Sequence, residues 1–455
     1  MSGATNGNDV PTHWLNILGD LPFELPPDLP PPARNERAER VKLQVPLALV
    51  RQSVNVTREI EIPPEVRNRY RAWRQTPLVR AERLEQAIGT KARIYYKYEG
   101  NNASGSHKLN TALAQAYYYK IAGAKRLTTG TGAGQWGTAL AIACNAFGMA
   151  CKVYMVGTSF RQKPYRKTIM QLYGAEVVSS PSPDTKVGAR MLSEGCTDAG
   201  NIAFAITEAL EDALAHDGSQ LCVGSGEAYS ILHATVIGLE ARAQLAEVEE
   251  QADVVLGSLG AGSNFGGIAF PFVAERLRGT SAVRCVSVES SACPKLTRGV
   301  YRYDYTDGSG VTPLQKMYTL GHNFRTPGMH AGGLRYHACS KLVSALYHHR
   351  AIEAVAYPQT DVFASALLFS RVEGIIPAPE AAHAVHGAIQ EATRARQNGE
   401  TPVVLFCLSG HGLFDMSAYG EYLDGRLKDI EVSEDEISAS LKALPAADST
   451  TEKCE

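Results

Sequence analysis

The sequence contains no C-x-x-C pair, no long uninterrupted apolar run and no marked excess of charge of either sign. Its nine cysteines are scattered between Cys144 and Cys454, which argues against a zinc ribbon or a disulfide framework and favours a reducing, cytoplasmic compartment. A net charge of -2 supplies no basic field for nucleic acid. No apolar stretch is long enough to cross a bilayer, so we expect no membrane segment, and the residue pattern predicts no metal site.

The composition that is present, 44% hydrophobic and 20% charged over 455 residues, is typical of a globular protein with about two domains. The opening "MSGATNGNDVPTHW" has no basic segment followed by an apolar one, so we expect no secretory signal. Residues 1–40 are polar and rich in proline, which predicts an extended N-terminal segment that lies on the body or is partly disordered. Residues 436–455 are predicted to form a disordered tail.

Between these ends, short β-branched or aromatic runs alternate with helical patterns, which indicates an α/β protein with parallel, twisted sheets flanked by helices. Strands are predicted within "ARIYYKYEG", "RLTTG", "CKVYMVG", "AEVVSSP", "ADVVLGSLG", "VRCVSVES" and "PVVLFCLSG". Helices are predicted at 107–123, 134–147, 163–173, 263–278 and 380–397. Glycine-rich loops follow several strands, which is where open α/β sheets bind ligands.

The stretch "YYKYEGNNASGSHKLNTALAQAYYYK", residues 95–120, places Lys108 just inside a predicted helix start. One interpretation is a solvated lysine on the shoulder of the helix. The other is a reactive amine, because a helix N-terminus disfavours a cation and lowers the pKa of an amine that forms an imine. Ser106 and His107 favour the second interpretation, because a histidine beside the amine can bind a phosphate.

The stretch "VVLGSLGAGSNFGGIAF", residues 254–270, leads from a buried strand through a glycine-rich turn into a helix. Glycines let backbone amides approach a phosphate, and the helix N-terminus adds partial positive charge. The alternatives are a tight strand–helix connection and a dinucleotide-binding loop. Phe265 interrupts the full G-x-G-x-x-G pattern and no acidic residue follows about 20 residues later at a strand end, so a phosphate monoester is favoured over a dinucleotide.

Three further stretches carry candidate side chains. Ser409 in "VVLFCLSGHGLFD" is either a helix N-cap or a hydroxyl that hydrogen-bonds a heteroaromatic nitrogen. Glu373 in "EGIIPAPEAAHA" is either a surface carboxylate or a buried acid, and Pro379 and Glu380 are typical of a helix first turn. Arg335 in "HAGGLRYHACS" is either structural or a clamp for a carboxylate or a phosphate.

Taken together, these stretches resemble the tryptophan synthase β chain family, and more closely its type-2 branch. The resemblance extends over about residues 12–430, and "PTHWLNILGDLP" is similar to the opening of that branch. The motifs that carry it, in chain order, are "SGSHKLNTALAQAYYYK", "GTGAGQWGTALA", "LHATVIGLEA", "GAGSNFGG", "HAGGLRYH", "EGIIPAPEAAHA" and "CLSGHG".

The resemblance implies a fold-type II enzyme that depends on pyridoxal 5′-phosphate (PLP), with the active site between two α/β domains. Residues 41–100 and 225–435 would form the domain that binds the phosphate and the ring. Residues 101–224 would form the mobile domain with the loop that binds the substrate carboxylate. The resemblance further implies a homodimer that takes a small amino acid and a small nucleophile, and its type-2 character leaves an α-subunit partner open.

The resemblance also implies roles for single residues. Lys108 would form the internal aldimine with PLP and move the α-proton. Ser409 would face the pyridine nitrogen, and Glu373 would lie near the ring. The other residues expected to bind the cofactor are His107, Asn110, Gly260, Gly262, Ser263 and Asn264. The residues expected to bind the substrate are Thr131, Gly132, Ala133, Gly134, Gln135, Trp136 and Arg335.

Two positions bear on the choice of substrate. Arg335 stands where the type-1 counterpart has an acid, and a cation beside the leaving group suits a phosphorylated hydroxy amino acid. Gly130 stands where the family has a catalytic glutamate that helps to expel the β-hydroxyl of serine. Acid–base groups of this kind contribute about 10²–10⁴ in rate, so Gly130 is the main departure from the family.

The activity implied by the resemblance is β-replacement on serine or O-phosphoserine through an aminoacrylate, with indole and L-serine giving L-tryptophan as the specific reaction. One alternative is β-replacement with a different nucleophile or a different β-substituted amino acid. A second is β-elimination from serine or threonine, as in a deaminase. A third is a protein that keeps the fold and PLP binding without efficient synthase activity. Gly130 keeps these alternatives open.

Overall fold

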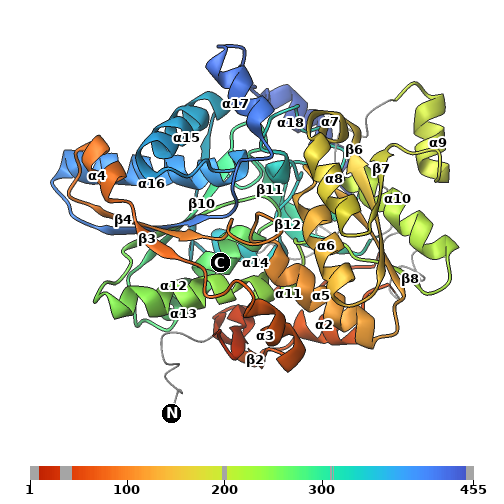
Figure 1. The fold of residues 1–455 in the computed structure, drawn as a ribbon, viewed down its shortest axis with the longest axis horizontal. Helices are drawn as coiled ribbons and strands as arrows, with labels where there is room; N and C mark the ends of the chain where they lie inside the picture. Colours follow the sequence, from red (N-terminus) through yellow and green to blue (C-terminus); the bar gives the residue numbers. More distant parts are fainter. Residues whose placement is uncertain (1–9, 31–43, 197–201, 308–309, 311, 447–455) are drawn as a thin grey trace.

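The computed structural model describes residues 10–30, 44–196, 202–307, 310 and 312–446. Two parallel sheets, each covered by helices on both faces, organise this part of the chain (Figure 1). The α/β class with parallel sheets predicted from the sequence is therefore confirmed. Within the described part, no helix combines the length and the apolar composition needed to cross a membrane.

The larger sheet has six strands in the order β13-β10-β9-β14-β4-β3, and its neighbouring strands are parallel except for β3 and β4. Strand β14 and its neighbours β4 and β9 are almost entirely buried, because helices cover both faces of the sheet there. This burial explains why their sequences are largely apolar or aromatic. The strands are β3 (Leu78–Arg80), β4 (Arg93–Tyr98), β9 (Val254–Ser258), β10 (Arg284–Ser290), β13 (Glu353–Tyr357) and β14 (Val403–Leu408).

The smaller sheet has four parallel strands in the order β7-β6-β5-β8. Its strands are β5 (Arg126–Thr131), β6 (Ala150–Val156), β7 (Glu176–Ser180) and β8 (Ser219–Leu221). Two antiparallel pairs complete the strands, namely β1 (His13–Leu15) with β2 (Glu59–Glu61) and β11 (Val300–Tyr305) with β12 (Leu314–Thr319). The division into domains at residues 101 and 225 stays a prediction.

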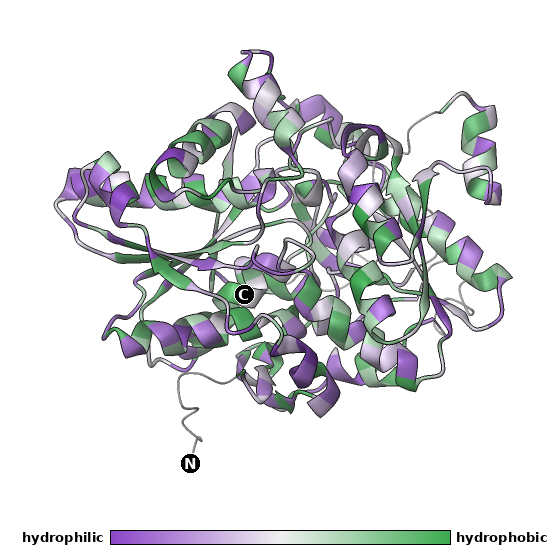
Figure 2. Ribbon diagram, viewed as in Figure 1, coloured by the Kyte–Doolittle hydropathy of each residue, from purple (hydrophilic) through white to green (hydrophobic). Residues whose placement is uncertain are grey.

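Helices α12, α13, α15 and α16 cover the larger sheet, and α6 and α10 lie on opposite faces of the smaller one (Figure 1). In Figure 2 the strands of both sheets are largely hydrophobic, whereas the outward turns of α4 and α16 are hydrophilic. The helices of the first half are α2 (Leu47–Gln52), α3 (Pro64–Tyr70), α4 (Glu82–Ile88), α5 (Leu109–Ile121), α6 (Gln135–Ala146), α7 (Gly157–Gln162), α8 (Pro164–Leu172), α9 (Lys186–Ser193) and α10 (Ile202–Ala215).

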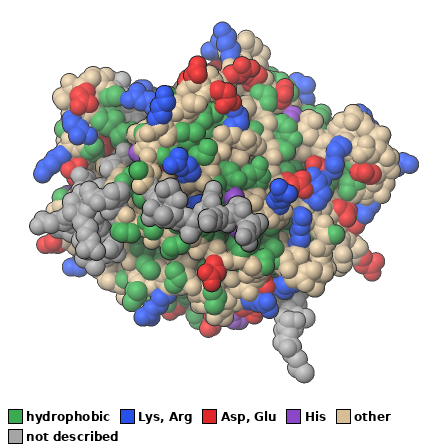
Figure 3. Space-filling view, turned by 180° about the vertical axis from the view of Figure 1, so that it is seen from behind, with side chains coloured by type: hydrophobic (Ala, Val, Ile, Leu, Met, Phe, Trp, Pro, Cys, Tyr) green, Lys and Arg blue, Asp and Glu red, His purple; other side chains and the backbone are tan. Residues whose placement is uncertain are grey.

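The helices of the second half are α11 (Ala228–Ala234), α12 (Val236–Glu247), α13 (Ser263–Leu277), α14 (Lys341–His348), α15 (Gln359–Glu373), α16 (Pro379–Asn398), α17 (Met416–Leu423) and α18 (Glu434–Leu441), and the 3-10 turns are η1 (Ile17–Asp20) and η2 (Gly332–Leu334). On the face shown in Figure 3, side chains of both charge signs are interspersed. Neither sign of charge forms a continuous field on that face.

Both ends of the described chain pack against the body. Trp14 is fully buried beside His233, so the first described residues are anchored through β1. The prediction of a disordered tail from residue 436 is wrong at its start, because 436–441 belong to α18. A capping box between Ser433 and Glu436 begins this helix, and Ile437 is buried in an apolar cluster. Residues 1–9 and 31–40 of the predicted N-terminal segment and the end of the tail, 447–455, lie outside the described residues.

Candidate active site

Lys108 lies where the loop after β4 enters α5, and it lines a cavity whose walls come from residues that follow both sheets. Its Nζ donates to Ser225 Oγ at 3.3 Å. Burial lowers the pKa of Lys108 to about 8, although the nearby Glu380 carboxylate acts in the opposite direction. A substantial fraction of this amine is therefore neutral near physiological pH, which is the form that attacks a carbonyl carbon.

A second, smaller cavity extends from Lys108 to the glycine-rich turn before α13. His107 Nε2 lies 3.2 Å from Ser263 Oγ at this turn. Burial, followed by the charge of Lys108, lowers the pKa of His107 well below its ordinary value, so the ring is neutral and acts through hydrogen bonds. The cavity is lined by Ser106, His107, Lys108, Gln135, Ser258, Gly260, Ala261, Gly262, Ser263, Asn264, Gly333, Leu334, Glu380 and Ser409.

This smaller cavity fits the phosphate and ring of PLP. The buried Ser106 Oγ and His107 Nδ1 have no hydrogen-bond partner among the described residues, so both have capacity for a polar ligand. Gly262 has a φ of 131°, a conformation that L side chains rarely adopt. The turn therefore presents backbone amides at the N-terminus of the 15-residue helix α13, which favours an anion.

Ser409 and Asn264 line the same cavity in different ways. Ser409 follows β14 and is 5% exposed, and its carbonyl accepts a hydrogen bond from the His107 backbone N–H. The Asn264 side chain is engaged in the fold, because its Oδ1 accepts from the Ser258 N–H at 3.0 Å and its Nδ2 lies 3.0 Å from Cys407 Sγ. Asn264 can therefore contribute to ligand binding mainly through its backbone.

Four residues of the loop 131–135 line the larger cavity together with Lys108, namely Thr131, Gly132, Ala133 and Gln135, whereas Gly134 lines neither cavity. The larger cavity encloses about 870 Å³ including its opening to solvent. This loop lies against η2, since a Cβ added to Gly132 would sit 3.2 Å from the Gly332 carbonyl oxygen. Trp136 lines the cavity at the start of α6, and its Nε1–H donates to Thr129 Oγ1 at 2.8 Å. Thus the structure brings the predicted substrate loop next to Lys108.

Glu380, in the first turn of α16, joins the two loops of the site. Its carboxylate accepts hydrogen bonds from Gln135 Nε2 at 2.9 Å and from the Gly333 N–H at 2.7 Å. Glu373, the acid expected near the cofactor ring, is absent from both cavity walls and instead accepts from the Leu84 N–H at 2.9 Å. The expectation for Glu373 is therefore wrong, because Glu373 ends α15 whereas Glu380 begins the helix that points into the site.

Asn110 is the second correction. Its side chain lies beneath the site, where Oδ1 accepts from Arg74 at 2.6 Å and Nδ2 donates to Glu99 at 2.8 Å and to the His107 carbonyl at 2.9 Å. Asn110 lines neither cavity. Since its donors and acceptor are engaged with the protein, Asn110 supports the Lys108 loop and does not bind the cofactor directly.

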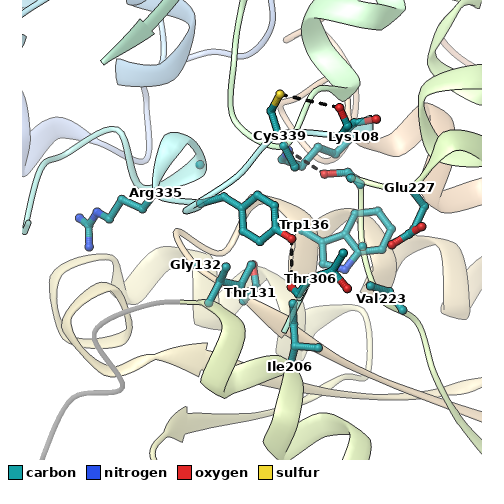
Figure 4. Close-up of a pocket in the computed structure, with 18 of the residues that line it drawn as sticks. Lys108, Thr131, Gly132, Trp136, Ile206, Val223, Glu227, Thr306, Arg335 and Cys339 are labelled. Atoms are coloured by element: carbon teal, nitrogen blue, oxygen red, sulfur yellow. Dashed lines mark hydrogen bonds between the residues drawn. The ribbon is translucent and has the colours of Figure 1, made fainter. Parts of the chain in front are cut away.

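Arg335 lines the larger cavity, but its guanidinium is directed away from Lys108 (Figure 4). It donates to the Met329 carbonyl oxygen. This geometry gives no support to the predicted clamp on a phosphorylated leaving group, because the guanidinium points away from Lys108 and donates to the backbone.

Gly130 lies inside β5 with the backbone of α10 directly against it. A Cβ at this position would lie 2.6 Å from the Ile206 nitrogen and 2.7 Å from the Ala205 carbonyl carbon. Any side chain therefore requires α10 to move. The space that a glutamate would enter is occupied by the backbone of α10. Gly130 itself lines neither cavity, whereas Ile206, which lies against it, lines the larger one.

Glu227 is a cavity residue that the sequence motifs did not single out. It lies in "GSGEAYS", immediately before α11, and burial raises the pKa of its carboxyl group. Nothing in the local sequence distinguishes it from a surface glutamate at a helix start. Only the arrangement of distant segments around the cavity identifies it.

Comparison with known sequences assigns the chain to a family. The profile of the family described as pyridoxal-phosphate dependent enzyme matches residues 70–410. The tryptophan synthase beta chain 2 of Methanosarcina acetivorans is 51% identical over 424 residues, covering 92% of this chain and 95% of that protein. The tryptophan synthase beta chain of Thermococcus gammatolerans is 50% identical, covering 95% of this chain and 98% of that protein.

Two solved structures share the fold at low sequence identity. A threonine deaminase from T.th. covers 77% of this chain and 97% of its own, with a TM-score of 0.52 at 19% identity. An L-serine ammonia-lyase from Rhizomucor miehei covers 77% and 98%, with a TM-score of 0.58 at 13% identity. These likenesses concern the fold alone.

Proposed function

Because the chain belongs to the tryptophan synthase β chain family of PLP-dependent lyases, we propose that it catalyses β-replacement on L-serine, with indole as the nucleophile that gives L-tryptophan. The observation that carries this proposal is the convergence of Lys108, the glycine-rich turn before α13 and the loop Thr131–Gln135 on adjoining cavities. Each supplies one requirement of the reaction, namely an amine, an anion site and a site for the substrate carboxylate.

PLP, when bound, supplies an electron sink for breaking the bond between Cα and hydrogen and for expelling a group from Cβ. Lys108 Nζ would hold the cofactor and carry the proton of Cα. His107, Ser263 and the amides after Gly260 would bind the phosphate. Ser409 would hydrogen-bond the ring nitrogen, and Glu380 would orient the loop Thr131–Gln135 through Gln135.

The orientation of Arg335 bears on which amino acid is the donor. The guanidinium of Arg335 is turned away from Lys108, so serine is favoured over O-phosphoserine as the donor (Figure 4). Because residue 130 is a glycine, no carboxylate stands at that position to protonate the leaving hydroxyl. Lys108 lines the same cavity, and as a free amine with a pKa of about 8 it would be able to supply that proton.

The cofactor half of the proposal is tested by reduction. Borohydride treatment of the purified holoenzyme should bleach its visible absorption and fix the cofactor on one peptide, the peptide with Lys108. A Lys108→Ala variant provides the matched control, and reduction should leave no cofactor covalently fixed on the corresponding peptide. Incorporation at another lysine would refute the assignment of Lys108.

The reaction half is tested with donors and nucleophile varied separately. Serine, O-phosphoserine and threonine are supplied with and without indole, and tryptophan, pyruvate and 2-oxobutyrate are measured. Tryptophan from serine is expected to exceed tryptophan from O-phosphoserine. Keto acid formation that indole leaves unchanged, without tryptophan, would identify an elimination enzyme instead.

The proposal extends to assembly and location. A homodimer in a reducing cytoplasm is supported by the family resemblance and by the eight described cysteines, which are all free thiols. Light scattering on a sizing column should give the mass of a dimer. A monomer that retains full activity would refute this part.

A further inference from the structure

The larger cavity continues past Lys108 into a region with mostly apolar walls. Ile202, Ile206 and Val223 line it on one side, and Met317 lies on β12. Such a lining suits an aromatic ring, which gains stability by leaving water. The region is therefore the natural binding site for the nucleophile.

Glu227 places a carboxyl group in this region, whose lining also includes the polar side chains of Thr306 and Gln315. Among the residues that line the larger cavity, it is the one acidic side chain. Although Glu227 directly precedes α11, its side chain makes no capping hydrogen bond. In Figure 4 its carboxylate lies on the side of the cavity where Trp136 is drawn. The carboxylate is therefore not used to stabilise the start of its own helix.

The surroundings of Glu227 leave negative charge in excess. The side chain of Gln315 hydrogen-bonds to it, and Asp28 and Lys341 lie close enough to act on it electrostatically. The Lys341 ammonium forms an ion pair with Asp28 at 2.8 Å, so its positive charge mainly neutralises Asp28 and not Glu227. One ammonium thus faces two carboxylates, and burial raises the pKa of Glu227 as expected for a carboxyl without a contacting cation.

Gly130 removes the other position from which an acid could contact the nucleophile. The backbone of α10 lies 2.6 Å from where its Cβ would be, so no side chain fits at this position unless α10 moves. An acceptor for a polar group on the nucleophile must then come from another element. Glu227 is the residue of this cavity whose carboxyl oxygens offer such an acceptor.

We propose that Glu227 determines the nucleophile, by binding an amino group carried by an aromatic ring at the end remote from the attacking carbon. The substrate class is an amino-substituted indole or a similar aromatic amine, and the inference rests on the proposed β-replacement. In the balanced reaction, the ring carbon exchanges its hydrogen for the Cβ of serine, a carbon–carbon bond forms, and water leaves. Glu227 holds the amino group and transfers no proton in this step.

The test compares amino-substituted indoles with methyl-substituted indoles of the same pattern, which have nearly the same size and lack the donor. Binding to the holoenzyme is measured by calorimetry, and KM and kcat are measured with serine. A hydrogen bond to a charged group contributes about 1.5–3 kcal/mol, so we expect at least one amino-substituted isomer to bind about tenfold or more tightly than its methyl partner.

Glu227→Gln should remove most of this preference while leaving the serine-dependent change in the visible spectrum intact. Met317→Leu changes the same wall without changing charge, and serves as the control that keeps the preference. The inference is overturned if no amino isomer is preferred by the wild type, or if Glu227→Gln retains the preference.

The same experiment separates this inference from the proposed function. If serine produces no spectral change and no product forms with any indole, the proposed β-replacement fails. The calorimetric preference for amino-substituted rings and its loss in Glu227→Gln would then still stand as a property of the cavity. If product forms equally from amino and methyl partners in both proteins, the β-replacement stands and the role of Glu227 fails.

Discussion

At the scale of a single residue, the pKa of Lys108 is a property whose direction the sequence predicts but whose size it does not. Its helix-start position predicted a lowered pKa, and burial lowers that pKa to about 8. In apoenzyme, the rate of PLP capture should rise with pH as the free amine forms and level off above about pH 8. An ordinary lysine would continue to gain reactivity up to about pH 10. Stopped-flow absorbance across this range measures the midpoint, and a midpoint near the ordinary value would contradict the burial.

The same shift has a consequence for stability. Between pH 8 and the ordinary lysine pKa, the unfolded chain holds a proton on Lys108 that the folded apoenzyme lacks. Stability therefore rises with pH across this window, since the unfolded state binds more protons there. Lys108→Met should flatten this rise in denaturant titrations of the apoenzyme.

Gly130 gives a second prediction at this scale. Because α10 lies against it, Gly130→Ala overpacks the contact between β5 and α10 and should lower the free energy of unfolding by about 1–3 kcal/mol. Gly130→Glu should destabilise the protein further and should not raise turnover with serine. Urea denaturation and initial rates measure both effects. A stable Gly130→Glu variant with higher turnover would show that α10 yields and that the missing acid limits the reaction.

At the scale of elements, α16 and η2 are coupled through one side chain. Glu380 links Gln135 of the substrate loop to the Gly333 N–H of η2, and its charge raises the pKa of Lys108. Glu380→Gln should therefore lower turnover by about tenfold or more, since a hydrogen bond to a charged group contributes about 1.5–3 kcal/mol. It should also move the titration of Lys108 in apoenzyme to lower pH.

Glu373→Gln is the matched comparison for Glu380→Gln. Glu373 contacts the start of α4 and lines neither cavity, so its replacement should cost stability of about 1 kcal/mol and leave turnover unchanged. Both variants are measured for kcat and for unfolding in urea. Equal losses of turnover in the two variants would contradict the placement of Glu380 in the site.

The elements of the sheets illustrate what the sequence can predict. β4, β5, β6 and β14 were expected from β-branched and aromatic runs, and they occur within one or two residues of those runs. Their signal is local, because a strand covered on both faces needs a continuous apolar segment. The contacts of Glu380, Asn110 and Glu227 cannot be predicted from such a local pattern. Each contact depends on which segment, distant in the sequence, packs against that side chain.

At the scale of the whole molecule, an ion pair joins segments that follow different sheets. Lys163 lies between α7 and α8, near the smaller sheet, whereas Asp415 precedes α17 and follows β14 of the larger one. Burial opposes ionisation of Asp415, but Lys163 and Arg166 outweigh it and hold the pKa of its carboxyl below the ordinary value. The pair therefore ties the two sheets on one side of the cavities.

Asp415→Asn should be strongly destabilising, since it leaves Lys163 and Arg166 buried without their negative charge. Breaking a buried pair by removing one partner costs about 3–5 kcal/mol. The contribution of wild-type Asp415 is present above the carboxyl pKa of the unfolded chain and is lost as pH falls through its lower folded value. Urea unfolding of both proteins as a function of pH should show the difference shrinking only in acid. A constant small difference would contradict the ion pair.

The central claim is that the residues around Lys108 support β-replacement although residue 130 is a glycine. The most direct measurement titrates indole at saturating serine and follows tryptophan and pyruvate in the same reaction. The account predicts that tryptophan rises with indole while pyruvate falls, because both products arise from one bound serine-derived species. Pyruvate that stays constant over the titration, with no tryptophan, would contradict it.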